Sequence, residues 1–110
     1  MSREALGNFE FMVLLATLRV RDDAYGVTIA REIEGKSGRP VLLGSVYAAL
    51  ERLESKGLVT SGLGDSTPER GGRAKKYFKV TAKGLREARD THRAMVGLWQ
   101  GLPHFHRGVA

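Results

Sequence analysis

Basic side chains gather on either side of two glycines in the stretch ERGGRAKK, residues 69–76. Long cations beside a flexible Gly-Gly turn can reach phosphates or enter the narrow minor groove of DNA, so this segment has the chemistry of a nucleic-acid contact. Taken alone, it is also compatible with a solvated charged hairpin. The candidate DNA-binding residues of this segment are Arg70, Gly72, Arg73, Lys75 and Lys76.

A second candidate surface lies on a short helix predicted from about residue 44 to residue 56. One face of this helix is apolar, and the other carries Ser45, Ala48 and Arg52. The major groove of DNA is roughly 12 Å wide and admits a helix whose entering face has no bulky core residues. Tyr47, beside this face, can donate to a phosphate near the helix start or pack at the helix edge.

These two surfaces need helices and a hairpin to hold them. Apolar spacing predicts a first helix buried on two sides, then a second helix capped by Asp22 and Asp23 and stopped by Gly35. A loop with a short strand leads to the third helix, which Gly57 ends, and Thr81 caps the last helix. The predicted ranges are residues 6–19 for the first helix, 36–44 for the loop, 58–63 and 74–80 for two strands, and 81–100 for the last helix.

This order of elements indicates an α+β, mainly α fold: a winged helix-turn-helix with a C-terminal dimerisation helix. We expect residues 1–80 to form a DNA-binding domain and residues 81–110 to form the dimerisation helix and a tail. A basic wing directly after a helix with a small face is a more specific signal than either part alone. The pattern therefore favours double-stranded DNA as the partner.

Composition agrees with this interpretation. The 110 residues suffice for about one domain, and 18 Lys and Arg against 12 Asp and Glu give a net charge of +6, which favours polyanionic partners. Cysteine is absent, so neither a disulfide nor a thiolate zinc site supports the fold. The apolar run at residues 11–16 is too short to span a bilayer. We expect a cytoplasmic protein with no membrane partner.

The last helix carries an apolar stripe with heptad-like spacing, which a lone domain of this size could not fully cover. The wide apolar surface of the first helix, which includes Phe9, supplies a second face for a two-fold homodimer. Two such DNA-reading helices would lie about 34 Å apart and read a near-palindrome. The stripe consists of Leu85, Ala88, His92, Met95, Trp99 and Leu102.

Four further side chains have alternative interpretations. Trp99 can stack a small aromatic effector, but interface packing is favoured because tryptophan is common in such contacts. His92 is interpreted as an interface residue rather than a pH switch. His104 and His106 lack a third ligand at a fixed spacing, so we expect no metal site. No catalytic constellation is found, and we expect neither a cofactor nor an enzymatic activity.

Three segments together resemble the PadR family of transcriptional regulators, which are winged helix-turn-helix proteins. These segments are Tyr25-Gly26 at the start of the second helix, SVYAALERLESKGLV and GGRAKKYFKVTAKG, and the resemblance spans nearly all of residues 6–102. It implies that the predicted helix at residues 44–56 is the recognition helix and that the basic segment at residues 69–76 belongs to the wing. It also implies that Tyr77 and Phe78 anchor the wing strand and that the protein represses transcription. The single C-terminal helix is similar to the shorter subtype of the family. The DNA-binding residues so implied are Tyr25, Ser45, Tyr47, Arg52, Gly72, Arg73, Lys75 and Lys76.

The sequence thus predicts a homodimeric, sequence-specific DNA-binding repressor that is released by an effector. Two alternatives remain open. In one, the winged fold engages an acidic protein partner. In the other, lysine and arginine contacts to phosphates bind DNA without base readout.

Overall fold

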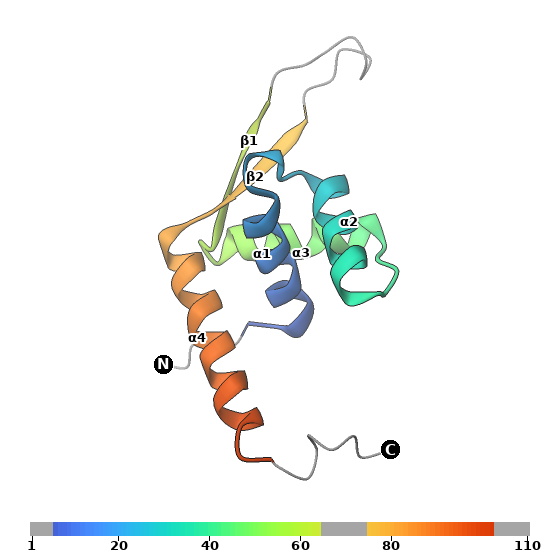
Figure 1. Ribbon diagram of the computed structural model, residues 1–110. Coiled ribbons are helices and arrows are strands. Elements are labelled where there is room, and N and C mark those ends of the chain that lie inside the picture. The colour runs from blue at the N-terminus through green and yellow to red at the C-terminus, as the bar shows by residue number, and fades with distance from the viewer. Residues whose placement is uncertain (1–5, 65–74, 103–110) are drawn as a thin grey trace.

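The computed structural model describes residues 6–64 and 75–102, which form a winged helix fold (Figure 1). Helices dominate this part of the chain, and a two-stranded antiparallel sheet completes it. The predicted α+β, mainly α class and the winged helix-turn-helix architecture are confirmed. The elements are α1 (Asn8–Val20), the 3-10 helix η1 (Arg21–Asp23), α2 (Gly26–Ser37), α3 (Leu43–Ser55), β1 (Val59–Leu63), β2 (Lys76–Val80) and α4 (Ala82–Trp99).

Helix α1 is the centre of the core. Figure 1 shows it between α4 and α2 with α3 crossing behind, and it contacts all three helices as well as β2. Val13 and Leu14 of α1 are fully buried together with Ile29 of α2 and with Leu50 and Leu53 of α3. Burial of side chains of this size contributes about 1.5–3 kcal/mol each. The predicted burial of the first helix on two sides is confirmed, and this packing decides which side of α3 stays exposed.

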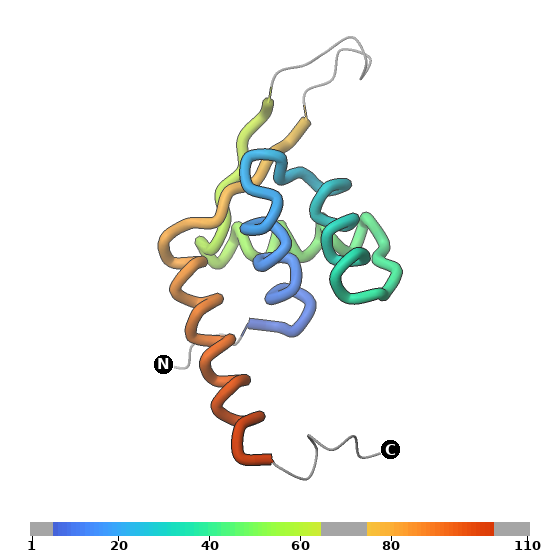
Figure 2. The backbone as a smooth tube through the Cα atoms, in the orientation of Figure 1, coloured from blue at the N-terminus to red at the C-terminus, as the bar shows by residue number. Residues whose placement is uncertain are grey.

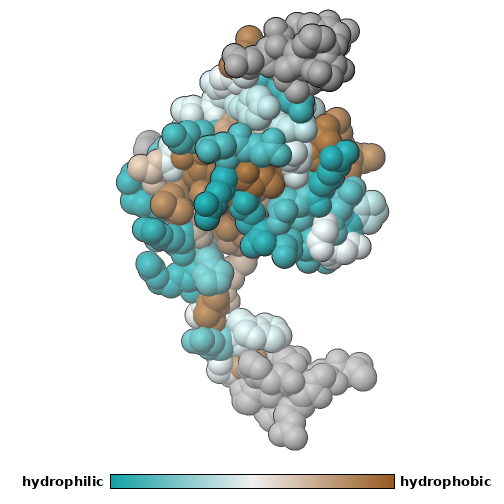
Figure 3. All heavy atoms as spheres, turned by 45° about the horizontal axis from the view of Figure 1, so that its top comes forward, coloured by the Kyte–Doolittle hydropathy of each residue, from teal (hydrophilic) through white to brown (hydrophobic). Residues whose placement is uncertain are grey.

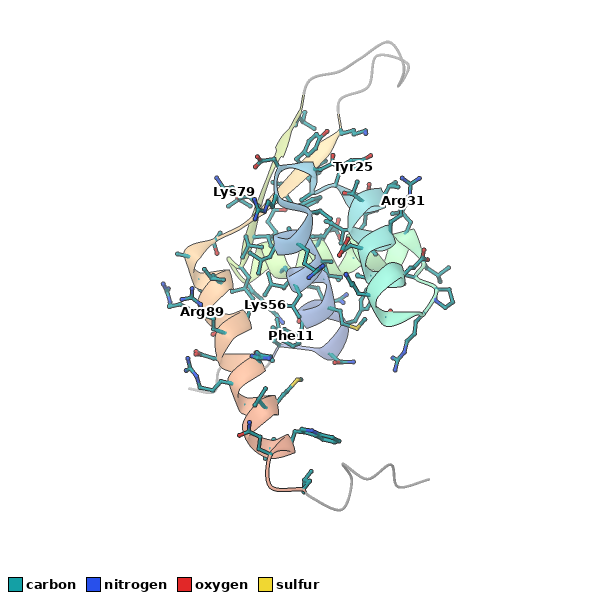
Figure 4. All side chains as sticks on the ribbon, viewed as in Figure 1. Phe11, Tyr25, Arg31, Lys56, Lys79 and Arg89 are labelled. Atoms are coloured by element: carbon teal, nitrogen blue, oxygen red, sulfur yellow. The ribbon has the colours of Figure 1, made fainter. Side chains whose placement is uncertain are left out.

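One carboxylate is buried at the junction of α1 and α3. Glu10, in the first turn of α1, accepts hydrogen bonds from Arg52 Nε and Lys56 Nζ, both at 2.7 Å. The backbone N–H of Gly7 donates to the same carboxylate at 3.1 Å. Burial by itself raises the pKa of Glu10, but the bonds from Lys56, Arg52 and Gly7 outweigh it and lower the pKa to about 2. Glu10 is therefore ionised at neutral pH and ties α1 to the end of α3, where Lys56 lies beside α1 (Figure 4).

The start and the end of α2 differ from the prediction. Asp22 and Asp23 do not cap this helix, because they belong to η1, and Tyr25 occupies the N-cap position instead. The backbone N–H of Tyr25 donates to the Thr28 hydroxyl at 3.1 Å. The helix also continues through Gly35 and ends at Gly38, whose φ of 73° lets its N–H reach the Glu34 carbonyl oxygen at 2.9 Å.

The loop between α2 and α3 contains no strand at residues 38–42, contrary to the prediction. It is held against α2 by a hydrogen bond from the backbone N–H of Val41 to the Glu34 carboxylate at 2.8 Å. Helix α3 then begins after Leu42, which supplies no side-chain cap. Gly57 follows its end with a φ of 78°, as predicted for a left-handed stop.

The predicted hairpin is confirmed, with strands that are slightly shorter than expected. β1 and β2 pair antiparallel, with Val59 opposite Val80 and Leu63 opposite Lys76. On its other edge, β2 makes a further backbone hydrogen bond, in which the Phe78 N–H donates to the Ala24 carbonyl oxygen at 2.8 Å. Phe78 is buried, so this bond and its ring attach the hairpin to the helices.

Helix α4 starts as predicted, because the Thr81 hydroxyl accepts from the Gly84 N–H at 3.0 Å. A Cβ at Gly84 would lie 2.1 Å from the Leu58 carbonyl oxygen, so only glycine lets α4 pack this closely on the start of β1. The rest of α4 leaves the body of the molecule, as the backbone tube shows (Figure 2). Within the described ranges, no helix is long and apolar enough to cross a membrane.

Replacement of Glu10 by glutamine should destabilise the fold at neutral pH and have no effect in strong acid. The amide keeps the side-chain shape but lacks the charge that Arg52 and Lys56 bind. Because the pKa of Glu10 is lowered from 4.5 to about 2, its contribution is complete above about pH 4.5 and is lost as pH falls through about 2. Allowing for solvent screening of Arg52, we expect a loss of roughly 1–3 kcal/mol at neutral pH.

Urea unfolding at a series of pH values from neutral to about pH 2 measures this effect. Glu51→Gln is the matched control, since Glu51 is exposed and should contribute little to stability. A stability difference between wild type and Glu10→Gln that stayed constant down to the lowest pH would contradict the expected role of the charge.

Candidate nucleic-acid interface

The exposed face of α3 is the side turned away from its four buried residues. It bears small or polar side chains along its middle and has one aromatic residue at its edge. Val46, Ala49, Leu50 and Leu53 make up the buried side. The exposed face consists of Gly44, Ser45, Tyr47, Ala48, Glu51, Arg52 and Ser55.

Gly44 opens this face and was not identified from the sequence. A Cβ added there would meet no atom within 4 Å, and the backbone has no positive φ at this position. Neither internal packing nor backbone conformation therefore requires glycine. The missing side chain leaves the α3 backbone open at this position.

All three tyrosines of the chain lie in one region, next to the start of α3. Tyr47 packs on Gly26, since a Cβ on that glycine would lie 2.3 Å from Tyr47 Cζ. Tyr25, which precedes Gly26, meets Tyr77 of β2 edge to face, with ring centroids 5.5 Å apart. This tyrosine row (Tyr47, Tyr25 and Tyr77) runs from α3 across the start of α2 to the hairpin, and Figure 4 shows Tyr25 to the right of the hairpin.

Cationic side chains continue this surface along the hairpin. Lys75 Nζ lies 3.8 Å from the centroid of the Tyr25 ring, a cation–π contact that holds the ammonium group beside the tyrosine row. Lys76 Nζ lies 5.7 Å from the Phe78 ring, and its side chain is exposed. The predicted wing residues Arg70, Gly72 and Arg73 lie outside the described residues.

Arg52 is less available than the sequence suggested. Its side chain is 52% exposed, but its Nε is bound to Glu10, so the guanidinium is drawn toward α1 at the margin of the exposed face. Glu10 was not predicted as its partner from the sequence. The available signal was an acidic residue between Phe9 and Phe11, in a helix predicted to be buried on two sides, where a carboxylate needs a cationic partner.

The stripe predicted on α4 divides into two parts. Ala88 is buried in the core of this chain and cannot contact a partner, and Leu85 is half-buried. Phe9 of α1 also packs against the core. The hydrophobic residues near the end of α4 remain exposed: Met95 is 46%, Leu98 79% and Trp99 52% exposed. His92 is exposed and Leu102 half-buried.

The described part of the chain contains no group of three His, Asp or Glu side chains that could hold a metal ion. His104 and His106 lie outside it.

Comparison with known proteins identifies the family. The model of the transcriptional regulator PadR-like family matches residues 14–90. A PadR family transcriptional regulator from Eggerthella lenta is 27% identical, with a TM-score of 0.68, over 88% of this chain and 82% of that chain. No curated protein sequence matches the chain.

Two further solved structures share the fold at lower identity. A PadR-like transcriptional regulator from Bacillus cereus is 21% identical, with a TM-score of 0.72, over 91% of this chain and 92% of that chain. A PadR family transcription regulator from Clostridium difficile is 24% identical, with a TM-score of 0.67, over 89% and 98%. Because the family match extends from α1 into α4 and includes all of α3 and the hairpin, this chain belongs to the PadR-like family of transcriptional regulators, which are DNA-binding proteins and not enzymes.

Proposed function

We propose that this PadR-like regulator is a sequence-specific repressor that binds a near-palindromic operator as a homodimer and is released by a small-molecule effector. The observation that carries the proposal is the exposed face of α3, which is small at Gly44 and Ala48 and lies next to the cationic base of the wing. Such a face can lie against base edges while its neighbours hold the phosphates.

The residues on this face have complementary tasks. Ser45 and Ala48 lie where α3 would face the major groove, and both are exposed. Tyr47, 39% exposed, keeps its position on Gly26 and would donate its hydroxyl to a phosphate. Arg52 would contact the backbone at the margin, where its guanidinium can bind a phosphate while Nε stays on Glu10. The base contacts at Ser45 and Ala48 would select the DNA sequence, whereas the phosphate contacts of Tyr47 and Arg52 would position the protein.

Lys75 and Lys76 would extend the contact to phosphates beside the groove. The Tyr25 ring restrains the Lys75 ammonium group, so less side-chain entropy is lost when that group binds. Arg70, Gly72 and Arg73 belong to the same proposed wing contact by their place in the sequence.

Homodimerisation is proposed through residues 81–110, with α4 as the central element. In Figure 3, a small group of hydrophobic spheres is exposed among hydrophilic ones on the slender lower part of the molecule. Met95 and Leu98, exposed on this part of α4, would be covered by a second copy of the chain. With a two-fold axis at α4, the paired α3 helices would read half-sites about 34 Å apart.

The effector is proposed to be small and aromatic and to act at the same seam. The half-exposed Trp99 offers a flat ring on which such a molecule can stack. A ligand bound between two α4 helices would change the separation of the two α3 helices and so weaken operator binding. Repression by occupancy of a promoter is proposed on the resemblance to the family. Cytoplasmic localisation is proposed because chromosomal DNA is the proposed partner.

Fluorescence anisotropy with duplexes selected from a random library, titrated over a salt series, tests the proposed function. Tight binding to the selected duplex and weak binding to its scrambled version is the expected result. Equal, steeply salt-dependent binding to both would support phosphate contacts without base readout. No binding to either would favour an acidic protein partner.

Replacement of Gly44 by leucine should abolish specific DNA binding and leave the fold intact. The added side chain meets nothing within the chain, but it fills the space that a base pair must occupy. Leucine also has the better helix propensity, so the free energy of unfolding should not fall. We expect at least roughly tenfold weaker binding to the selected duplex, by analogy with the loss of a base contact worth 1–3 kcal/mol.

Gly35→Leu is the matched control for this variant. Gly35 also lies within a helix, is exposed, and a Cβ there would meet no atom within 4 Å. Unchanged affinity in the Gly44 variant, or an equal loss in both variants, would remove α3 from the proposed interface.

Replacement of Met95 by glutamate should yield a folded monomer with weakened operator binding. An unpaired charge cannot be buried in an apolar seam, whereas the exposed side chain is not needed by the monomer. Sedimentation equilibrium gives the oligomeric state, and circular dichroism reports the fold. Gly97→Glu places the same charge on another side of α4, where a Cβ would meet nothing, and should remain a dimer. A Met95 variant that stayed a dimer would exclude this seam.

A further inference from the structure

Glu51 is an acidic residue in the middle of the exposed face of α3. It lies one turn after Ala48 and two turns after Gly44, on the side of the helix opposite Leu53. A negative charge at this place opposes the phosphates of DNA, in a chain whose net charge is +6. Glu51 must therefore either weaken DNA binding or accept a hydrogen bond from a partner group.

The other glutamates in residues 6–64 all have partners within the chain. Glu10 binds Arg52 and Lys56, Glu32 pairs with Arg19 Nε at 2.5 Å, and Glu34 accepts from the Val41 N–H. Glu54 accepts from the Ser61 hydroxyl at 2.7 Å. Glu51 alone among them has neither a hydrogen bond nor an ion pair with the described residues.

The cations nearest to Glu51 along α3 are directed elsewhere. Arg52 is the next residue and Lys56 caps the same helix, but both donate to the buried Glu10. The carboxylate of Glu51 is consequently left with all its acceptor capacity on the face that would meet DNA. Ser55, one turn later, is short and does not cover it.

In the major groove, hydrogen-bond donors come from bases and not from phosphates. The N4 amino group of cytosine is the donor that glutamate and aspartate accept from. Because Gly44 and Ala48 are small, α3 can approach the base edges closely enough for the short stem of Glu51 to reach them. Guanine and thymine present no donor on this edge, and adenine presents its N6 amino group beside the N7 acceptor, which repels a carboxylate. On these bases the desolvated carboxylate would therefore gain less than on cytosine.

We propose that Glu51 determines specificity by accepting a hydrogen bond from the N4 amino group of one cytosine in each half-site. The same charge lowers affinity for all other duplexes, so a single side chain both rewards the correct base and penalises the wrong ones. This inference rests on the proposed function, since it requires α3 to lie in the major groove.

The test compares wild type, Glu51→Ala and Glu51→Gln on the selected duplex and on duplexes in which each G·C pair is changed in turn. Wild type should lose about tenfold in affinity at one cytosine position per half-site, the size expected for one base contact. Glu51→Ala should lose that discrimination and bind random duplex more tightly. Glu51→Gln should shift the preference at the same position toward adenine, which glutamine reads.

Asp90→Asn is the matched control, because it removes the same charge from an exposed position on α4. It should leave the base preference unchanged. If Glu51→Ala kept the wild-type discrimination at every position, or strengthened binding to all duplexes by the same factor, the inference would be overturned. Failure of wild type to prefer any duplex would instead overturn the proposed function, and this inference with it.

Discussion

The buried carboxylate of Glu10 is the interaction on which the geometry of the exposed face of α3 depends. It joins the first turn of α1 to Arg52 and Lys56 near the end of α3. A buried charge is tolerated only with partners, so α1 and α3 are held in the one arrangement that supplies them. Together with the burial of the apolar side of α3, this contact fixes the rotation of α3 about its axis and the residues that face outward.

The same contact distributes charge over the proposed interface. Because Glu10 engages Arg52 and Lys56, the middle of the exposed α3 face keeps only one charged group, that of Glu51. Cationic character lies instead at the edge, where Lys75 is held over the Tyr25 ring. In the proposed complex, uncharged and acidic groups would face the bases and cations would face the DNA backbone. This arrangement favours selection of sequence over indiscriminate phosphate binding.

Close backbone approaches connect the three parts of this structure. Gly26 lets Tyr47 of α3 pack on α2, and Gly84 lets α4 pack on the start of β1. The Ala24 carbonyl oxygen bonds to Phe78 and ties the hairpin to the α1–α2 connection. Each contact joins segments that are distant in sequence, so the hairpin, α3 and α4 keep fixed positions relative to one another. In the proposed dimer, a displacement of α4 would for this reason also displace α3.

The sequence by itself determined the fold class, the order of the helices and the hairpin, and the Thr81 cap, because apolar periodicity and turn residues act locally. Both ends of α2 were wrong in the prediction, and the short strand expected in the following loop is absent from residues 38–42. There the outcome rests on distant or competing partners: Ala24 pairs with Phe78, and Val41 bonds to Glu34. Only the tertiary structure showed that Ala88 belongs to the core, that Glu10 engages Arg52, and that Gly44 and Glu51 share an open face. These features depend on tertiary contacts between segments that are distant in sequence, and the local spacing of residues does not specify such contacts.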